Sequence, residues 1–294
     1  MRRIAPPTEI DRIEAPTRER FERDYADYNR PVVMTGIVDK WPAMKWNFDY
    51  LREVAGDTIV RTRYDSDGDH LNYYTPTGGK TREIAFGDYL DGLVADPPDT
   101  QHYLSQYDVS AVSPKLCEGL DYGRYPAGAL SVFFIGRGTY SPNHHHGHAE
   151  AALCQISGRK LVKLYPPHQS RCMYPYPWYS PLTNFSRVDD RVPDLARFPR
   201  FRDARSLTVE LQPGEMLFIP VHWWHSIETP DLAVSVTFFW ASQRRRYHFP
   251  SPGLQMYAHS WFSPFAVKGK LSRVMKKLSN RSGGCIPAAG GQLP

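Results

Sequence analysis

The sequence predicts a mainly β fold in which residues 100–242 form a jelly-roll barrel, also called a double-stranded β-helix. From residue 130 onward the apolar runs are short and apolar on both sides, which is typical of one sheet packed against another. Turn-forming pairs such as Pro213-Gly214 and Pro230-Asp231 separate these runs. The 294 residues include 26 prolines and are 13% aromatic, which favours a β-rich fold over a helical bundle.

Residues 1–100 are expected to form a region of helices and strands that packs on the barrel. Residues 17–29 predict a polar helix capped by Thr17, and residues 47–57 predict a second helix capped by Asn47. A further helix is expected within residues 78–98, and short strands at residues 31–38, 57–65 and 100–110.

The apolar strands of the barrel are expected to begin with "LSVFFIG" at residues 130–136. Residues 150–166 predict two strands joined as a hairpin at a Ser-Gly pair, and residues 206–241 predict three or four more strands. Residues 168–206 form a long irregular insertion rich in Tyr, Trp and Pro, and insertions of this length are often functional. We expect this insertion to cover the mouth of the barrel.

Residues 243–294 are expected to form a C-terminal extension, a basic amphipathic helix followed by a flexible tail. The net charge of +5 is too small to indicate a nucleic-acid polymer as partner. No run approaches the ~18 apolar residues of a membrane span, and no apolar run follows the N-terminal arginines as in a signal peptide. The four cysteines form no CxxC pair, so a reduced, cytoplasmic protein is expected.

The stretch "NHHHGHAE" at residues 143–150 is the main candidate for a chemical site. On a strand, His144 and His146 point to one face, and His145 and Gly147 point to the other. Alternation alone leaves open which of the two faces lies inside. Imidazole is a suitable ligand for iron, zinc, copper and nickel, so the cluster predicts a metal site that a distant ligand completes.

His225, in "PGEMLFIPVHWWHSIE", is the best candidate for this distant ligand. It follows an apolar strand, and Trp223 and Trp224 are placed to keep water away from it. His222 is a weaker competitor. His148 is expected to lie at the surface or behind the ligands, and not to bind the metal itself.

Two family resemblances follow from these residues. Gly138, the histidine cluster and Glu150 resemble the first motif of the cupins, and Gly214, Pro220 and His225 resemble the second. The chain from about residue 30 to 242 is more closely similar to the JmjC-type cupin-like hydroxylases, the group that includes the asparaginyl hydroxylase acting on hypoxia-inducible factor. The blocks that carry this resemblance are "CQISGRKLVKLYPP", "YPYPWYSPLTNFSRVD", "ARFPRF" and "LQPGEMLFIPVHWWHSIE".

The resemblance implies an oxygenase that binds Fe(II) through His-x-Asp and a distal His and uses 2-oxoglutarate and O2. A lysine fifteen residues after the first His of the motif pairs with the distal carboxylate of 2-oxoglutarate, and Lys160 fits that role. Tyr103 and Ser141 resemble a Tyr and a Thr of the same pocket. Thr237 is a further candidate for binding the cofactor.

The chain departs from the family at the Asp, and two registers are open. The spacing to Lys160 places the motif on His145 and Gly147, and this is the register we favour from sequence. Spacing from Ser141 places it instead on His144 and His146, with His225 as third ligand. If Glu150 were a fourth ligand, 2-oxoglutarate would fill both remaining positions and exclude O2.

The favoured register resembles iron/2-oxoglutarate halogenases, in which chloride binds where the carboxylate is missing. Catalytic residues His145, Gly147 and His225 would then chlorinate a small molecule, as JmjC-like halogenases do with nucleotides. Arg244, Arg245 and Arg246 are candidates for holding a phosphate of that substrate. The alternatives are a hydroxylase of a peptide, protein or small molecule, a cupin enzyme without 2-oxoglutarate, and a non-catalytic binding protein. Related hydroxylases also imply a homodimer through the C-terminal helix.

Overall fold

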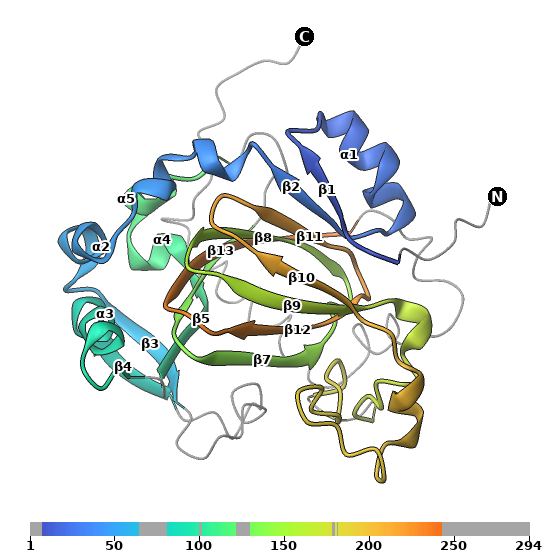
Figure 1. The fold of residues 1–294 in the computed structure, drawn as a ribbon. Coiled ribbons are helices and arrows are strands. Elements are labelled where there is room, and N and C mark those ends of the chain that lie inside the picture. Colours follow the sequence, from blue (N-terminus) through green and yellow to red (C-terminus); the bar gives the residue numbers. More distant parts are fainter. Residues whose placement is uncertain are drawn as a thin grey trace.

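The computed structural model describes residues 8–64, 81–99, 102–121, 130–177, 180 and 182–242. Within them, a nine-stranded sheet and a four-stranded sheet face each other as the two walls of a barrel (Figure 1). This architecture confirms the predicted mainly β, jelly-roll fold. The expected C-terminal helix and tail, the dimer contact assigned to them and the three arginines at 244–246 lie outside the described residues.

The larger sheet combines strands from the N-terminal region with strands of the barrel. Its order is β1 (Asp11–Glu14), β2 (Val32–Thr35), β11 (Met216–Ile219), β8 (Ala149–Ser157), β13 (Ala233–Ala241), β6 (Leu130–Gly136), β5 (His102–Asp108), β3 (Ile59–Tyr64) and β4 (Thr81–Ala85). β1 and β2 pair in parallel, and the other neighbours pair antiparallel. The N-terminal region therefore extends the wall of the barrel.

The smaller sheet carries the strand that bears the histidine cluster. Its order is β10 (Leu207–Leu211), β9 (Lys160–Tyr165), β12 (Trp224–Thr229) and β7 (Thr139–His144). Leu153 and Leu217 of the larger sheet pack against Val162, Leu164 and other apolar residues of the smaller one. This shared apolar layer closes one part of the barrel interior and leaves the rest for a pocket.

Helices and turns cover the outer face of the larger sheet. They are α1 (Arg18–Asp24), α2 (Phe48–Ala55), α3 (Phe86–Val94), α4 (Val109–Val112), α5 (Pro114–Cys117) and 3-10 turns at Ala26–Tyr28, Val38–Lys40 and Pro42–Lys45. Two further 3-10 turns, Pro167–Gln169 and Pro199–Asp203, lie between β9 and β10 in the chain. Thr17 and Asn47 cap α1 and α2 as predicted, each accepting a backbone N–H. Phe21 and Leu51 join the core against the sheet, so its strands are apolar on both faces.

Two predictions about local structure were wrong. β8 and β9 follow each other in sequence but do not pair as a hairpin, because β8 pairs with β11 and β13 while β9 pairs with β10 and β12. The Ser-Gly turn instead carries the chain from one sheet to the other, as a barrel of two sheets requires. β4 was also missed, since residues 78–98 were expected to contain a helix and no strand.

The insertion at 168–206 has no α-helix or β-strand element among its described residues, in agreement with the expected irregular structure. Asp190 attaches it to the smaller sheet, because its carboxylate accepts hydrogen bonds from Tyr140 at 2.7 Å, Ser226 at 2.7 Å and Tyr165 at 3.1 Å. Separately, none of the helices in the described part of the chain is long and apolar enough to cross a membrane.

Replacing Gly158 tests the crossing between the sheets. Gly158 has a φ of 66°, and an added Cβ would overlap the carbonyl oxygen of Leu232. We therefore expect Gly158→Ala to lower the free energy of unfolding by at least about 2 kcal/mol, measured by urea denaturation. Gly92→Ala in α3 is the control, because its Cβ would meet Asp99 at an ordinary 3.5 Å. Equal unfolding midpoints for the two variants would contradict this account of the turn.

Candidate metal centre and cofactor pocket

The pairing of β7 with β12 places His144 directly opposite His225. Directly opposed residues on neighbouring strands share a face of the sheet, and this face is the barrel interior. Both side chains are buried, with 7% of His144 and 1% of His225 exposed. Their ring centroids lie 4.3 Å apart.

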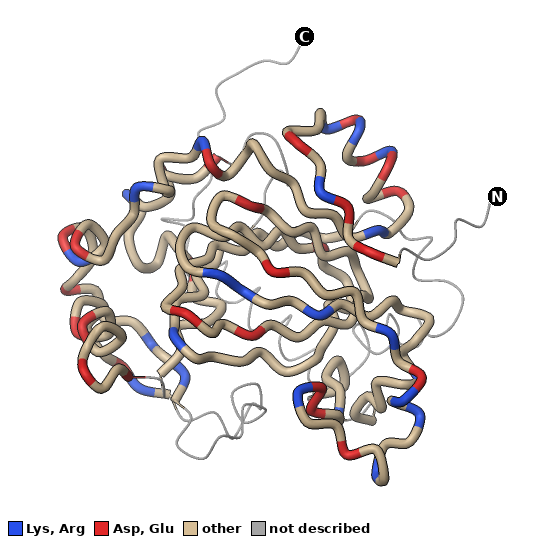
Figure 2. Tube along the Cα trace, in the orientation of Figure 1, with Lys and Arg blue, Asp and Glu red and all other residues tan. Residues whose placement is uncertain are grey.

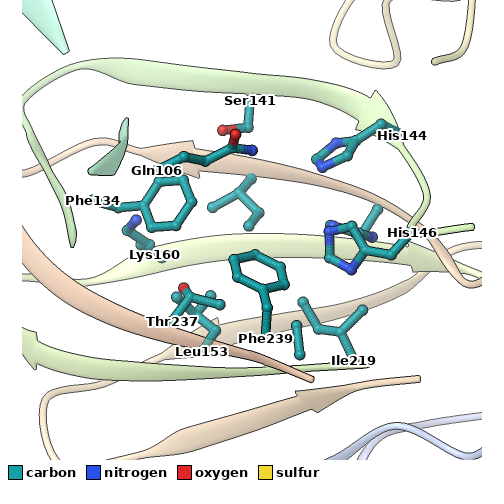
Figure 3. A pocket seen from close by; sticks show the side chains of 13 residues that line it. Gln106, Phe134, Ser141, His144, His146, Leu153, Lys160, Ile219, Thr237 and Phe239 are labelled. Carbon is teal, nitrogen blue, oxygen red and sulfur yellow. The ribbon is translucent and has the colours of Figure 1, made fainter. Parts of the chain in front are cut away.

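His146 completes a cluster of three imidazoles. Its ring centroid lies 4.7 Å from that of His225 and 5.5 Å from that of His144. One ligand atom from each of the three side chains lies within 4.8 Å of the others. Figure 3 shows His144 and His146 side by side at one end of a pocket.

Hydrogen bonds to the backbone set the orientation of two of these rings. Nδ1 of His144 lies 2.8 Å from the carbonyl oxygen of Pro142, and Nδ1 of His225 lies 3.0 Å from that of Trp223. A carbonyl oxygen only accepts, so each Nδ1 carries the proton and each Nε2 carries the lone pair. This second hydrogen bond from the ring is the usual arrangement of a metal-binding histidine.

Burial keeps the three imidazoles neutral. It lowers the pKa of His144 to about 4, and it holds the pKa of His146 and of His225 well below the usual range. Neutral imidazole is the form that binds metals. Nδ1 of His146 is buried without a hydrogen-bond partner in the described structure. The cluster therefore fits a first-row transition metal by donor type, protonation and closeness.

The preferred register of the motif, His145 with Gly147, does not match this geometry and is corrected. The buried ring of His145 lies on the other side of β7, with its centroid 4.6 Å from that of Trp224 and 5.9 Å from that of His222. The β-strand ends at His144, so Gly147 falls in a bend beyond it. Alternation along the strand left two registers open. The pairing with β12 decides between them, because it places His144 opposite His225.

Two other candidates from the sequence serve different roles. The carboxylate of Glu150 accepts hydrogen bonds from Nε1 of Trp240 at 2.9 Å and from Oγ of Ser242 at 2.8 Å, and Glu150 is not part of the histidine cluster. The backbone N–H of His222 donates to the carbonyl oxygen of His146, and the ring of His222 also lies outside the cluster. His148 is exposed, as predicted.

Lys160 lies at the far end of the same pocket from His144 and His146 (Figure 3). Its side chain is 1% exposed, and Nζ lies 5.2 Å from the centroid of the Phe134 ring. Burial lowers the pKa of this amine to about 7. A lysine amine this deeply buried is costly unless an anion pairs with it, so the position favours an anionic ligand in the pocket.

The pocket has an empty volume of about 420 Å³, including the part that opens to solvent. Ser141 and Thr237 line it as predicted, whereas Tyr103 does not. Tyr103 is buried beside the pocket, with its ring centroid 6.2 Å from that of the lining residue Phe134. The remaining lining residues are mainly apolar: Ala151, Leu153, Ile219, Ile227 and Phe239.

Gln106 lines the pocket but carried no signal in the sequence. It has a φ of 55° and lies at a bulge, where the pairing of β5 with β6 shifts between Ser105 and Tyr107. A bulge redirects a side chain that regular alternation would place elsewhere. Neither a bulge nor a left-handed glutamine follows from hydrophobic patterning, which is why this residue was missed.

Comparison with known proteins agrees with this geometry. A family model described as "Cupin-like domain" matches residues 18–246. The chain belongs to this cupin-like family. The match includes every strand of the two sheets except β1, together with the three clustered histidines and Lys160, and it confirms at the family level the resemblance found in the sequence.

The relatives of this cupin-like chain include proteins named as lysine demethylases and as a lysyl hydroxylase. It is 34% identical over 81% of its length to lysine-specific demethylase 8 of Danio rerio, and 33% identical over 80% to the protein of the same name in Xenopus tropicalis. It is 26% identical over 76% of its length to the bifunctional peptidase and (3S)-lysyl hydroxylase JMJD7 of Homo sapiens. The matches cover 60%, 53% and 81% of these relatives.

The buried imidazoles predict how the stability of the metal-free protein depends on pH. The unfolded chain takes up protons below the usual His pKa of 6.5, whereas folded His144 stays neutral down to about 4. The free energy of unfolding should therefore fall as the pH drops from 6.5 to 4, with up to about 3 kcal/mol from His144.

Urea denaturation across this pH range measures the effect. His144→Gln should reduce the dependence on pH, and His148→Gln, at an exposed position, should leave it unchanged. An identical dependence in wild type and His144→Gln would show that the burial of this imidazole is not its cause.

Proposed function

We propose that this chain is an Fe(II)- and 2-oxoglutarate-dependent oxygenase that hydroxylates a side chain of a polypeptide. The observation that carries the proposal is that one pocket contains both a cluster of three histidines and a buried lysine. Three neutral imidazoles at one end suit a divalent metal, and a buried lysine at the other suits a carboxylate. Family membership supports the same pair of cofactors.

The number of ligands fits this chemistry. His144, His146 and His225 would hold the ion through three protein ligands, which would leave room on it for 2-oxoglutarate and O2. Glu150 as a fourth ligand would have left too little room for both, but its carboxylate accepts hydrogen bonds from Trp240 and Ser242. When bound, iron and 2-oxoglutarate supply the oxidation of a C–H bond by O2, with 2-oxoglutarate converted to succinate and CO2.

The protein's own residues bind and orient this cofactor. Lys160 pairs with the distal carboxylate of 2-oxoglutarate, and the pairing raises the lowered pKa of its amine so that the charged form is restored. Ser141 and Thr237 offer hydroxyl groups along the pocket wall. Phe134 and Phe239 exclude water from the pocket and so strengthen the charge pairing.

His146 stands where the resemblance implies an Asp, and this bears on the choice between hydroxylation and chlorination. The halogenase hypothesis needed Gly147 beside the metal, with chloride in the space of the missing side chain. With His146 in the cluster, that position holds an imidazole, so hydroxylation is the function we propose. Chloride then has no assigned place in this site.

The names of the relatives support a polypeptide substrate. Lysine-specific demethylase 8 and the (3S)-lysyl hydroxylase are named for action on lysyl residues, and both share the greater part of this chain. The small-molecule or phosphate-bearing substrate, the homodimer, the absence of nucleic-acid and membrane partners and the cytoplasmic location stay predictions from sequence.

Exchange of His146 tests the metal assignment. His146→Leu should weaken the binding of Co(II), a spectroscopic substitute for Fe(II), by at least about 100-fold, because it removes one of three ligands. His146→Asp restores the carboxylate of the family pattern and should retain Co(II) binding and 2-oxoglutarate-dependent release of succinate. His148→Leu is the matched control. Wild-type affinity in His146→Leu would exclude His146 as a ligand.

Exchange of Lys160 tests the 2-oxoglutarate assignment. Lys160→Met should weaken binding of 2-oxoglutarate to the Mn(II)-loaded protein by at least about 30-fold, because a buried charge pair loses one partner. Calorimetry should also show uptake of protons by the wild type above pH 7, since pairing raises the pKa of Lys160 from about 7.

Lys163→Met, on the same strand, is the control for this experiment. Nζ of Lys163 lies 3.2 Å from the carbonyl oxygen of Asp190 and 3.6 Å from the carboxylate of Glu228, away from the pocket lining. It should bind 2-oxoglutarate like the wild type. Equal affinities for Lys160→Met and Lys163→Met would remove the cofactor role of Lys160.

A further inference from the structure

The irregular segment 168–206 is unusually rich in arginine. It contains seven arginines and no lysine, against four aspartates and no glutamate. Figure 2 shows these charges on the segment that Figure 1 places beside the end of β7. The function proposed above uses none of these arginines.

Three of them stack on a pair of aromatic rings, and we call these five residues the arginine surface. The guanidinium carbons of Arg197 and Arg187 lie 5.1 and 5.8 Å from the centroid of the Phe198 ring. That of Arg200 lies 4.6 Å from the centroid of Tyr174, and the two ring centroids are 5.1 Å apart. Phe198 is buried and the arginines are exposed. Stacking holds a guanidinium by its face and leaves its N–H edges available for an anion.

The backbone holds this arrangement in place. Tyr174 has a φ of 45°, a left-handed conformation that costs free energy for a residue with a large side chain. Its hydroxyl accepts the backbone N–H of Arg200 at 2.9 Å, and its carbonyl accepts Nε of Arg187 at 3.3 Å. These bonds retain the strained conformation, so the arginine surface is ordered before any partner binds.

The charge of the arginine surface is not neutralised by its neighbours. Within the described residues, no carboxylate forms an ion pair with Arg187, Arg197 or Arg200, whereas Arg191 pairs with Asp189. An exposed guanidinium with outward N–H groups binds carboxylates with two parallel hydrogen bonds. The chemistry therefore calls for an acidic partner.

The arginine surface lies next to the strand that carries the candidate metal ligands. Ser186 donates its backbone N–H to Asn143, His145 donates to Asn184, and the ring of Phe185 stacks on His144 at 5.0 Å. Residues 174–176 pair in turn with 185–187, through Pro175 and Ser186. Only this narrow ribbon separates the arginine surface from β7.

We propose that the arginine surface docks an acidic stretch of a polypeptide and thereby presents a neighbouring residue to the pocket. That the docked polypeptide is the substrate rests on the proposed oxygenase function, whereas the docking itself does not. The exposed carboxylates Asp189, Asp194 and Asp203 lie in the same segment. They would repel a continuous phosphate backbone, whereas a peptide with spaced carboxylates avoids them, so a polypeptide is favoured over a nucleic acid.

Binding of a fluorescent peptide in which glutamates alternate with pairs of neutral residues, measured with the metal-free protein, tests the docking. Arg197→Gln/Arg200→Gln should weaken this binding about tenfold, as loss of two exposed ion pairs predicts. Arg18→Gln/Arg20→Gln removes the same charge from α1 and should leave the affinity within about twofold. Arg197→Lys/Arg200→Lys keeps the charge without the planar guanidinium and should bind with intermediate affinity.

Equal weakening by the two Gln pairs would show a general effect of net charge and overturn the proposal, as would an unchanged affinity in Arg197→Gln/Arg200→Gln. Tighter binding of a single-stranded oligonucleotide through Arg197 and Arg200 would replace the polypeptide with a nucleic acid. Equal thermal unfolding midpoints establish that each variant is folded. Because no metal or 2-oxoglutarate is present, failure here is distinct from failure of the His146 and Lys160 experiments.

Discussion

The antiparallel pairing of β7 with β12 is the constraint on which the site depends. It opposes His144 to His225 inside the barrel, and each ring is then oriented by donation from Nδ1 to the carbonyl oxygen two residues earlier in the chain. His146 lies two residues beyond the strand end and returns to the same side. A shift of this pairing by one residue would put His145 in the interior and break the cluster.

Burial gives the pocket its chemistry at a cost to stability. Removal from water keeps the imidazoles neutral for a metal and lowers the pKa of the Lys160 amine, so the pocket is lined by buried polar groups suited to bind a metal and an anion. Gln106 adds a strained backbone at the pocket wall. Groups that are poorly satisfied alone and well satisfied by a cofactor are the expected form of a preorganised site.

The irregular segment 168–206 is held to the barrel by polar contacts more than by regular structure. Tyr140, Tyr165 and Ser226 donate to the buried carboxylate of Asp190, and the segment also adds a short ribbon to the edge of β7. Because these contacts come from the strands that carry the site, the arginine surface and the histidine cluster are fixed relative to each other. This fixed relation is what the proposed docking of a polypeptide beside the pocket requires.

The sequence alone determined the jelly-roll class, most strands and the caps Thr17 and Asn47, since these follow from periodicity and turn chemistry. It also indicated His225 as the distal candidate, whereas the place of Lys160 in the pocket was implied by the family resemblance. Only the tertiary structure decided which face of the histidine stretch lies inside. Alternation fits His144 with His146 as well as it fits His145 with Gly147. The pairing of β7 with β12 favours the first pair, because it places His144 opposite His225. The crossing at Gly158, the bulge at Gln106 and the bonds that occupy Glu150 are likewise set by contacts distant in sequence, which local patterning does not encode.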